Sequence, residues 1–199
     1  MSELKVNKIS PATGTAFALG DSGDTFTVPS GATIVNSGTA TGFGGGKVLQ
    51  VLTVQKLNSF TTSSVSFVDV TDITLDITVA GTSSKVMILL MSRLSPTADG
   101  YPIYAQFLRD STVIGSGSGS AGADCFGNAH PWSDAARHGH PTDFVWLDSP
   151  SSDGSSALTY KMQVRNYATS ACYVGRSTSS SATYAADYPT SLTLMEIGA

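Results

Sequence analysis

The segment that decides the fold runs from Ile73 to Val79 and reads ITLDITV. Its apolar and polar side chains alternate strictly, which is the period-two pattern of a β-strand with one buried face. The same alternation returns in Leu158 to Arg165, which reads LTYKMQVR. Because successive side chains of a strand point to opposite faces, each segment predicts a strand that lines one side of a core.

A third segment, Val86 to Met91, is apolar throughout and reads VMILLM. A strand that is apolar on both faces is typical of the middle of a sheet, so we expect both of its sides to be covered. It is the longest purely apolar run in the chain, and a transmembrane helix needs about 20 such residues. The sequence therefore predicts no membrane insertion.

The rest of the chain after residue 46 continues the strand pattern, and no segment has a convincing helical period. About ten short strands joined by Ser- and Gly-rich turns predict an all-β fold, a β-sandwich of the jelly-roll type. The expected strands are Val48–Leu57, Val65–Val70, Ile73–Val79, Lys85–Leu94, Tyr101–Arg109, Thr112–Ile114, Phe144–Leu147, Leu158–Asn166, Ala171–Gly175 and Ser191–Ile197.

Residues 1–46 differ from this domain, which we place at 47–199. Short apolar bursts such as Phe17/Leu19 and Phe26/Val28 alternate with breaks such as Asp21–Asp24 and Pro29–Gly31, which predict turns. Strands this short bury too little surface to stand alone. We interpret the segment as a short β-stalk whose core several chains share, and a disordered leader is the alternative. The glycines of residues 42–46 predict a hinge.

Composition excludes several classes of protein. Charged residues make up only 13% of the 199 residues, the formal net charge is −4, and about a quarter of the positions are Ser or Thr. A nucleic-acid-binding protein usually carries a basic face, and a coiled coil needs abundant Glu, Lys and Leu in heptads. We therefore expect no nucleic-acid partner. The first residues, MSELK, lack an apolar signal segment, so we expect no secretion by the standard route.

Two parts of the sequence contain runs that follow one another in a characteristic order. The leader contains Leu4–Ile9 and Leu19–Ile34. The domain contains Gly46–Val51, Phe67–Thr71, Ser83–Val86, Phe107–Asp110, Leu147–Pro150, Thr159–Arg165 and Ser191–Ile197. Both parts resemble bacteriophage fibre proteins, notably those of marine and cyanobacterial phages. The order and spacing of these runs carry the resemblance, which covers nearly the whole chain except residues 115–143.

The resemblance implies a virion structural protein that forms a homotrimer. Its N-terminal segment would attach to other virion proteins through Leu4, Val6 and Ile9, and its jelly-roll domain would face outward. We expect a tail fibre or host-attachment protein, located on the tail rather than the head. The alternative is a capsid fibre, decoration or tail adaptor protein that binds other virion proteins and no receptor.

The long connection from Gly115 to Asp143 is the predicted binding surface, because loops of this length in compact domains are often functional. A Trp beside polar side chains is typical of a surface that recognises a partner or stacks on sugars, although Trp132 could equally cap the sandwich. A host-surface glycan or a virion protein would bind Phe126, Asn128, His130, Trp132, Asp134 and Arg137. The same rim could be bordered by residues near the C-terminal loops, for which a packing role is an equal alternative: Tyr173, Arg176, Tyr184 and Tyr188.

The same connection contains His138 and His140, an H-x-H pair. On an extended strand both rings point to one side, and three copies round an axis would present six imidazoles to a metal ion. The alternative, which we favour, is a solvated loop with ordinary histidines. No cofactor is expected.

Enzymatic chemistry is weakly supported. Asp124, Asp134 and Asp143 lie in the long connection and could converge as the paired carboxylates of a glycosidase, but loop aspartates are more often turn formers. The G-x-G-x-x-G match at 117–122 has no helix after it and is better explained as a flexible loop. We expect no enzyme activity, and we expect Trp146 to lie in the core.

Overall fold

The computed structural model describes Pro11, Thr13, Gly14 and residues 21–25, 27–33, 35, 47–97, 101–117, 125–129, 139–177 and 186–198. The chain divides into two compact units, Met1–Phe43 and Gly44–Ala199. In the first unit, the described residues form a turn from Asp21 to Asp24 and another from Pro29 to Ala32, where the sequence predicts breaks. The apolar residues Phe17, Leu19 and Phe26 and the predicted attachment residues Leu4, Val6 and Ile9 lie outside the described residues.

The second unit is built of antiparallel strands, and its described residues contain no helix. None of the described residues belongs to a helix long and apolar enough to cross a membrane. The strands are β1 (Val48–Lys56), β2 (Phe60–Thr62), β3 (Val68–Ile77), β4 (Lys85–Met91), β5 (Arg93–Pro96), β6 (Ile103–Arg109), β7 (Thr112–Ile114), β8 (Gly127–Ala129), β9 (His140–Pro141), β10 (Phe144–Asp148), β11 (Leu158–Asn166), β12 (Cys172–Val174) and β13 (Thr190–Ile197).

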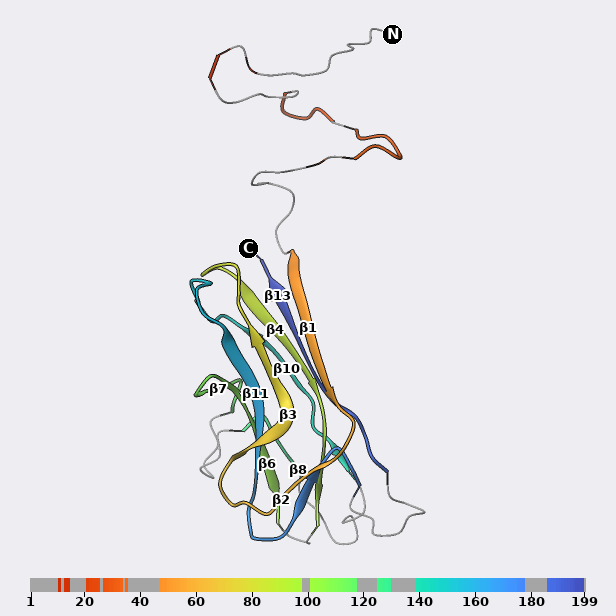
Figure 1. Cartoon of the computed structure of the whole chain (residues 1–199), viewed down its shortest axis with the longest axis vertical. Helices are drawn as coiled ribbons and strands as arrows, with labels where there is room; N and C mark the ends of the chain where they lie inside the picture. Colours follow the sequence, from red (N-terminus) through yellow and green to blue (C-terminus); the bar gives the residue numbers. More distant parts are fainter. Residues whose placement is uncertain are drawn as a thin grey trace. The chain divides into compact units, whose positions relative to one another are not determined.

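Two sheets form the sandwich, and their strand order is that of a jelly roll (Figure 1). The first sheet has the order β1-β13-β4-β10, and the second has the order β3-β11-β6, with β7 and β8 both paired to β6. Eight strands form the sandwich, and in chain order they are β1, β3, β4, β6, β8, β10, β11 and β13. If they are numbered one to eight in this order, the first sheet holds strands one, eight, three and six. The second holds two, seven, four and five. The two interlocked Greek keys confirm the predicted fold class.

A third, smaller sheet has the order β2-β12-β5-β9. Each of its strands is the chain neighbour of one strand of the first sheet, and the four occur in the same order. The small sheet therefore extends the first sheet beyond a break in all four strands. It lies at the end of the sandwich away from the C-terminus (Figure 1).

We name the two ends of the sandwich from this arrangement. At the proximal end, where the chain passes into the domain, Val48 pairs with Ile197 and the amide of Gly198 donates to the carbonyl of Lys47 at 2.7 Å. At the distal end, Lys56 pairs with Thr190 and the small sheet begins. The two ends of the domain's chain therefore lie together, and the small sheet lies opposite them.

The core lies between the two large sheets. Ile73 and Ile77 of the segment that predicted the fold are completely buried, as are Ile88 and Leu90 of β4. Burial of an aliphatic side chain of this size stabilises the fold by about 1.5–3 kcal/mol. The ring of Phe107 stacks on that of Phe144 at 5.1 Å, which joins the second sheet to the edge of the first.

A buried polar cluster also joins the sheets. The carboxylate of Asp148, on β10, accepts hydrogen bonds from the Arg109 guanidinium at 2.6 Å and from the Tyr160 hydroxyl at 2.7 Å. The pKa of the Tyr160 hydroxyl is raised far above its ordinary value, mainly because the group is buried and to a smaller extent because it donates to Asp148. Tyr160 therefore stays protonated and acts as a donor between the two sheets.

The structure differs from the predicted strands at two breaks. Lys85–Leu94 is interrupted at Ser92, whose amide donates to Asp143 at 3.1 Å and whose side chain binds the carbonyl of Thr142. Conversely, Val65–Val70 and Ile73–Val79 join into the single strand β3 across an irregularity at Asp72, which has a φ of 65°. Asp tolerates this left-handed conformation better than most residues, so the strand continues through it.

The expectation that Trp146 lies in the core is wrong, because 43% of its surface is exposed. Its ring stacks on Phe144 at 6.3 Å, at the edge strand β10 where the first sheet ends. Cys172, by contrast, is completely buried in β12, and this burial raises the pKa of its thiol to about 11.

Candidate functional site

The distal end is the candidate site, since residues 129 and 139, which flank part of the long connection, are held there. Ala129 and Gly139 flank residues 130–138; Ala129 pairs with Ile103 at the start of β6, and His140 pairs with Leu94 of the small sheet. Gly139 packs closely against its neighbours: a Cβ at this position would lie 3.0 Å from the Ser95 hydroxyl. The predicted binding connection is therefore anchored in the small sheet.

The residues predicted to border the rim meet this anchor. A Cβ on Gly139 would lie 3.6 Å from the carbonyl oxygen of Arg176, which also accepts a hydrogen bond of 2.5 Å from Ser95. Arg176 follows Gly175, whose φ of 78° lets the chain turn where a side chain would collide with the carbonyl of Tyr188 at 2.9 Å. Residues in or next to β5, β9 and β12 are thus brought together, and their role in a binding rim stays a prediction; Tyr184 lies outside the described residues.

Arginine and tyrosine side chains pair at this end. The guanidinium of Arg93 lies 4.3 Å from the ring centre of Tyr188, and that of Arg176 lies 4.5 Å from the ring centre of Tyr173. These are cation–π contacts, in which a guanidinium lies over the face of a ring. Arginine presents several N–H donors in a fixed fork suited to carboxylate and phosphate groups. A surface of this kind can bind an anionic or hydroxyl-rich ligand.

Two further tyrosines form an exposed aromatic pair. The rings of Tyr101 and Tyr167 stack with their centres 6.2 Å apart, and they are 42% and 60% exposed. The amide of Tyr167 donates to the carbonyl of Pro102 at 3.0 Å, which holds the two tyrosines beside each other. Flat rings with a hydroxyl at the edge are suited to sugars and to protein partners. Sequence reasoning missed this pair, because its members are far apart in the chain and lie in no common motif.

The predicted binding residues are only partly described. Phe126 is half-buried and its ring lies 4.8 Å from that of Phe144, so its described contact is with the core. Asn128 is exposed on β8, opposite Tyr104. The predicted residues His130, Trp132, Asp134 and Arg137 lie outside the described residues. Their role in binding remains a prediction.

The predicted metal and carboxylate residues are described only at two positions. His140 is half-buried in β9, and its Nε2 has no hydrogen-bond partner within the described part of the chain. The described ranges contain no group of three His, Cys, Asp or Glu side chains able to hold a metal ion. Asp143 is exposed and accepts a hydrogen bond from the Ser92 amide, which suits a structural role. His138, Asp124 and Asp134 lie outside the described residues.

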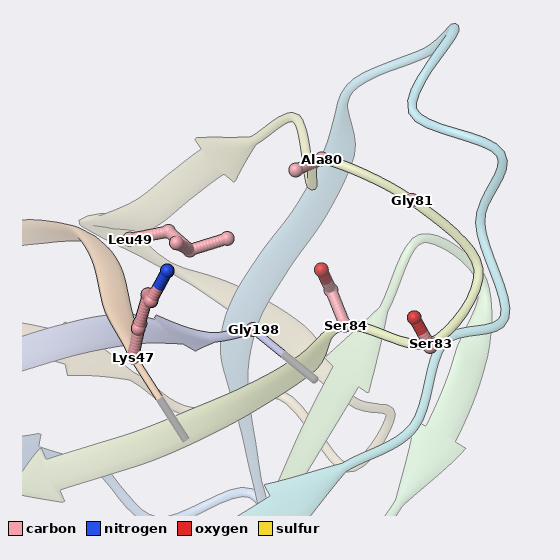
Figure 2. Close-up of a pocket in the computed structure, with 7 residues that line it drawn as sticks. All are labelled: Lys47, Leu49, Ala80, Gly81, Ser83, Ser84 and Gly198. Carbon is pink, nitrogen blue, oxygen red and sulfur yellow. The ribbon is translucent and has the colours of Figure 1, made fainter. Parts of the chain in front are cut away.

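The proximal end contains a shallow hollow of about 240 Å³. Figure 2 shows its lining residues, which come from the start of β1, the turn between β3 and β4, and the residue after β13: Lys47, Leu49, Ala80, Gly81, Ser83, Ser84 and Gly198.

The buried carboxylate of Glu196 fixes that turn. It accepts hydrogen bonds from the Ala80 amide at 2.6 Å and from the side chains of Ser84 and Gln50, each at 2.7 Å. Burial alone would raise the pKa of Glu196, but these donors outweigh burial and lower it below the ordinary value. All three donors stabilise the charged form, so Glu196 serves the structure of the proximal end.

Comparisons with known proteins give limited likenesses. No family model matches the chain, and no curated protein matches it. Among solved structures, a chain of T=1 particles derived from infectious bursal virus is similar at 12% identity with a TM-score of 0.40, covering 75% of this chain and 36% of that one. A chain of the Gx strain of infectious bursal disease virus is similar at 13% identity with a TM-score of 0.39, covering 75% of this chain and 40% of that one.

A third similar structure is the VP2 subviral particle of infectious bursal disease virus, at 11% identity with a TM-score of 0.36, covering 74% of this chain and 39% of that one. The chain thus spans well under half the length of each of these proteins. Its assignment as a jelly roll rests on its own strand order.

Proposed function

We propose that the chain is a virion structural protein of a bacteriophage, a homotrimeric tail fibre or host-attachment protein without enzyme activity. Its N-terminal segment binds other virion proteins, and its jelly-roll domain faces outward. A jelly roll alone supports many functions, so the proposal depends on the site and on the resemblance of the sequence to phage fibre proteins.

The observation that carries the proposal is the separation of the two ends of the domain. The chain passes into the domain at Lys47, beside Gly198, whereas the Arg–Tyr pairs and the exposed Tyr101 and Tyr167 lie at the opposite, distal end. A domain tethered at one end and furnished with aromatic and arginine side chains at the other is suited to contact a host-surface glycan. Residues 129 and 139, which flank the predicted binding residues His130, Trp132, Asp134 and Arg137 in the sequence, lie at the same end.

The runs that carry the family resemblance support the proposal as well. Thr159–Arg165 and Ser191–Ile197 fall within β11 and β13, and Phe67–Thr71 overlaps β3. They therefore belong to the framework of the sandwich, and the connection outside the resemblance is the one anchored at the distal end. This is the arrangement expected of a shared scaffold with a variable binding loop.

Cryo-electron microscopy of intact particles, with this chain traced, tests the location. We expect three copies on the tail with the small sheet directed away from the particle. A chain found on the capsid shell, or with its distal end buried against another virion protein, would instead establish the decoration or adaptor function and overturn host attachment.

Adsorption of particles to host cells tests the distal surface. The double substitution Tyr101→Ala/Tyr167→Ala removes the exposed ring pair, and we expect adsorption to fall about tenfold or more, as for the loss of one binding hot spot. Ser83→Ala, at the proximal hollow, is the matched control and should leave adsorption unchanged. Trp132→Ala tests the predicted loop in the same assay; undiminished adsorption by both distal variants would refute host binding at this end.

A further inference from the structure

The outer face of the sheet β1-β13-β4-β10 carries a continuous apolar surface. Its central row crosses all four strands through Val51, Met195, Met87 and Leu147, each paired with the next. Their chain neighbours, such as Leu194, Val86 and Ile88, are completely buried on the inner side. Val51 is 53% exposed and Leu147 44% exposed, so this row faces away from the core.

The next row towards the distal end extends this surface. It runs through Thr53, Thr193, Leu89 and Val145, and Val145 is 65% exposed. The two threonine hydroxyls bind each other at 2.9 Å, so the polar groups in this row already have a partner. We call these two rows, together with Met91 of β4 in the row beyond them, the apolar face.

Strand β4 shows that the single chain leaves this face incomplete. Its sequence predicts a strand covered on both sides, but only Val86, Ile88 and Leu90 are buried. On the other side, Met87 and Leu89 are half-exposed and Met91 is 63% exposed. A contiguous exposed apolar surface of this kind marks an interaction site.

The charge on this face indicates what covers it. At the outward positions of these four strands, all of which the structure describes, Lys85 is the one charged side chain, and it lies at the proximal edge. A surface without charge can meet an identical surface without repulsion, whereas a charged surface would place like charges together. The apolar face therefore complements a copy of itself.

We propose that the apolar face is the surface through which copies of this chain associate. The inference rests on the proposed trimeric virion protein and assigns its interface to the rows of Val51 and Thr53. Three copies round an axis parallel to the strands present their apolar faces to one another. In this arrangement the three proximal ends lie together, as a shared N-terminal stalk requires, and the distal surfaces remain open.

Mass measurement on the full chain by light scattering tests the proposal. Val145→Asp puts a charge in the apolar face, and its matched control is Thr74→Asp, at an exposed outward position of β3 on the opposite sheet. We expect three chain masses for the wild type and for Thr74→Asp, and one chain mass for Val145→Asp with an unchanged circular dichroism spectrum. Three chain masses for a folded Val145→Asp would overturn the proposal.

Methionine oxidation of the wild-type protein is a second test of the interface, and it remains available if Val145→Asp does not fold. Met162 is completely buried in the core and serves as the internal reference, while Met91 is exposed in the single chain. In the assembled protein at high concentration, we expect hydrogen peroxide to oxidise Met91 as slowly as Met162, as read by peptide mass spectrometry. Oxidation of Met91 tenfold faster than Met162 in the assembled protein would place the interface elsewhere.

The results separate this inference from the proposed function. A wild-type chain that has one chain mass at every concentration overturns both the trimer and its interface. A trimer that survives Val145→Asp overturns only the interface, and a trimer that assembles as described but is found on the capsid overturns only host attachment.

Discussion

The two outer faces of the sandwich differ in the polarity of their side chains. On the sheet β3-β11-β6, Lys161 binds Asp69 at 2.9 Å, Gln163 binds Asp69 at 2.6 Å, and Thr159 binds Asp76 at 2.6 Å. On the sheet β1-β13-β4-β10, the two outward rows of the apolar face carry Val, Leu and Met, with Thr53 and Thr193 between them. One face is polar and satisfied within the chain, and the other is apolar and open.

This difference in polarity indicates which face would gain stability from binding a second molecule. A polar face whose groups bind one another gains little from a second molecule, since exposed ion pairs contribute only about 0–1 kcal/mol each and are already formed. An apolar face gains about 25 cal/mol for each Å² that leaves water. Both sheets share one core, so the asymmetry of the sandwich lies entirely in its outward side chains.

The largest effect on stability is expected from separating the two sheets. Asp148→Ala leaves the Tyr160 hydroxyl and the Arg109 guanidinium without their acceptor between the sheets, and we expect a loss of about 3 kcal/mol in the free energy of unfolding. Urea denaturation measures this value. Tyr160→Phe removes one hydrogen bond while keeping the ion pair, so it should cost about 1–2 kcal/mol. Equal losses for the two variants would show that Asp148 does not join the sheets as described.

An intermediate effect is expected at Glu196, which joins the apolar sheet to the turn between β3 and β4. Because the pKa of Glu196 is lowered in the folded chain, the ionised carboxylate stabilises the fold at every pH above the ordinary pKa of a glutamate. This stabilisation is lost as the pH falls through the folded pKa. Glu196→Gln should lower the free energy of unfolding by about 1–2 kcal/mol at pH 7. It should also flatten the dependence of that free energy on pH below about pH 5.

Urea midpoints measured from pH 7 to pH 3 check this prediction. Gln50→Ala removes one of the three donors and serves as the control; it should lower stability less and keep most of the pH dependence. If the urea midpoint of Glu196→Gln depends on pH as that of the wild type does, the pH dependence does not come from the Glu196 carboxylate.

The smallest effect is expected on the polar face. Asp69 is half-exposed, and although burial would raise its pKa, the bonds from Gln163 and Lys161 lower it. Asp69→Asn should reduce the free energy of unfolding by about 1 kcal/mol or less, with a smaller loss at high salt. Its mass in solution should remain that of the wild type. A change of oligomeric state in this variant would mean that the polar face also contacts a copy.

The sequence predicts the framework because long strands have a period. The bounds of Leu158–Asn166 and Thr112–Ile114 agree with β11 and β7. The strands β2, β8 and β9 are missed, since each has only two or three residues and exists because a neighbouring strand supplies its hydrogen bonds. Their pairing is a property of the fold and leaves no local pattern in the chain.

The candidate site is less predictable than the framework. Tyr173, Arg176 and Tyr188 are predicted to border the rim because they lie near the C-terminal loops, and the structure places the carbonyl of Arg176 close to Gly139. Tyr101 and Tyr167 meet only through the pairing of β6 with β11, so their stacking has no sequence signal. Trp146 misleads because its strand is apolar, yet it lies on an edge that the sandwich leaves partly uncovered.

The pairing of β1 with β13 has a mechanical consequence. The two strands run side by side from Val48 and Ile197 at one end to Lys56 and Thr190 at the other. A pull applied between Lys47 and the distal surface acts along the strands, so it strains their hydrogen bonds in shear, all at once. Peeling would break them one at a time at a far lower force. The domain is thus built to carry tension along its length, and it is weakest against a sideways pull on either strand.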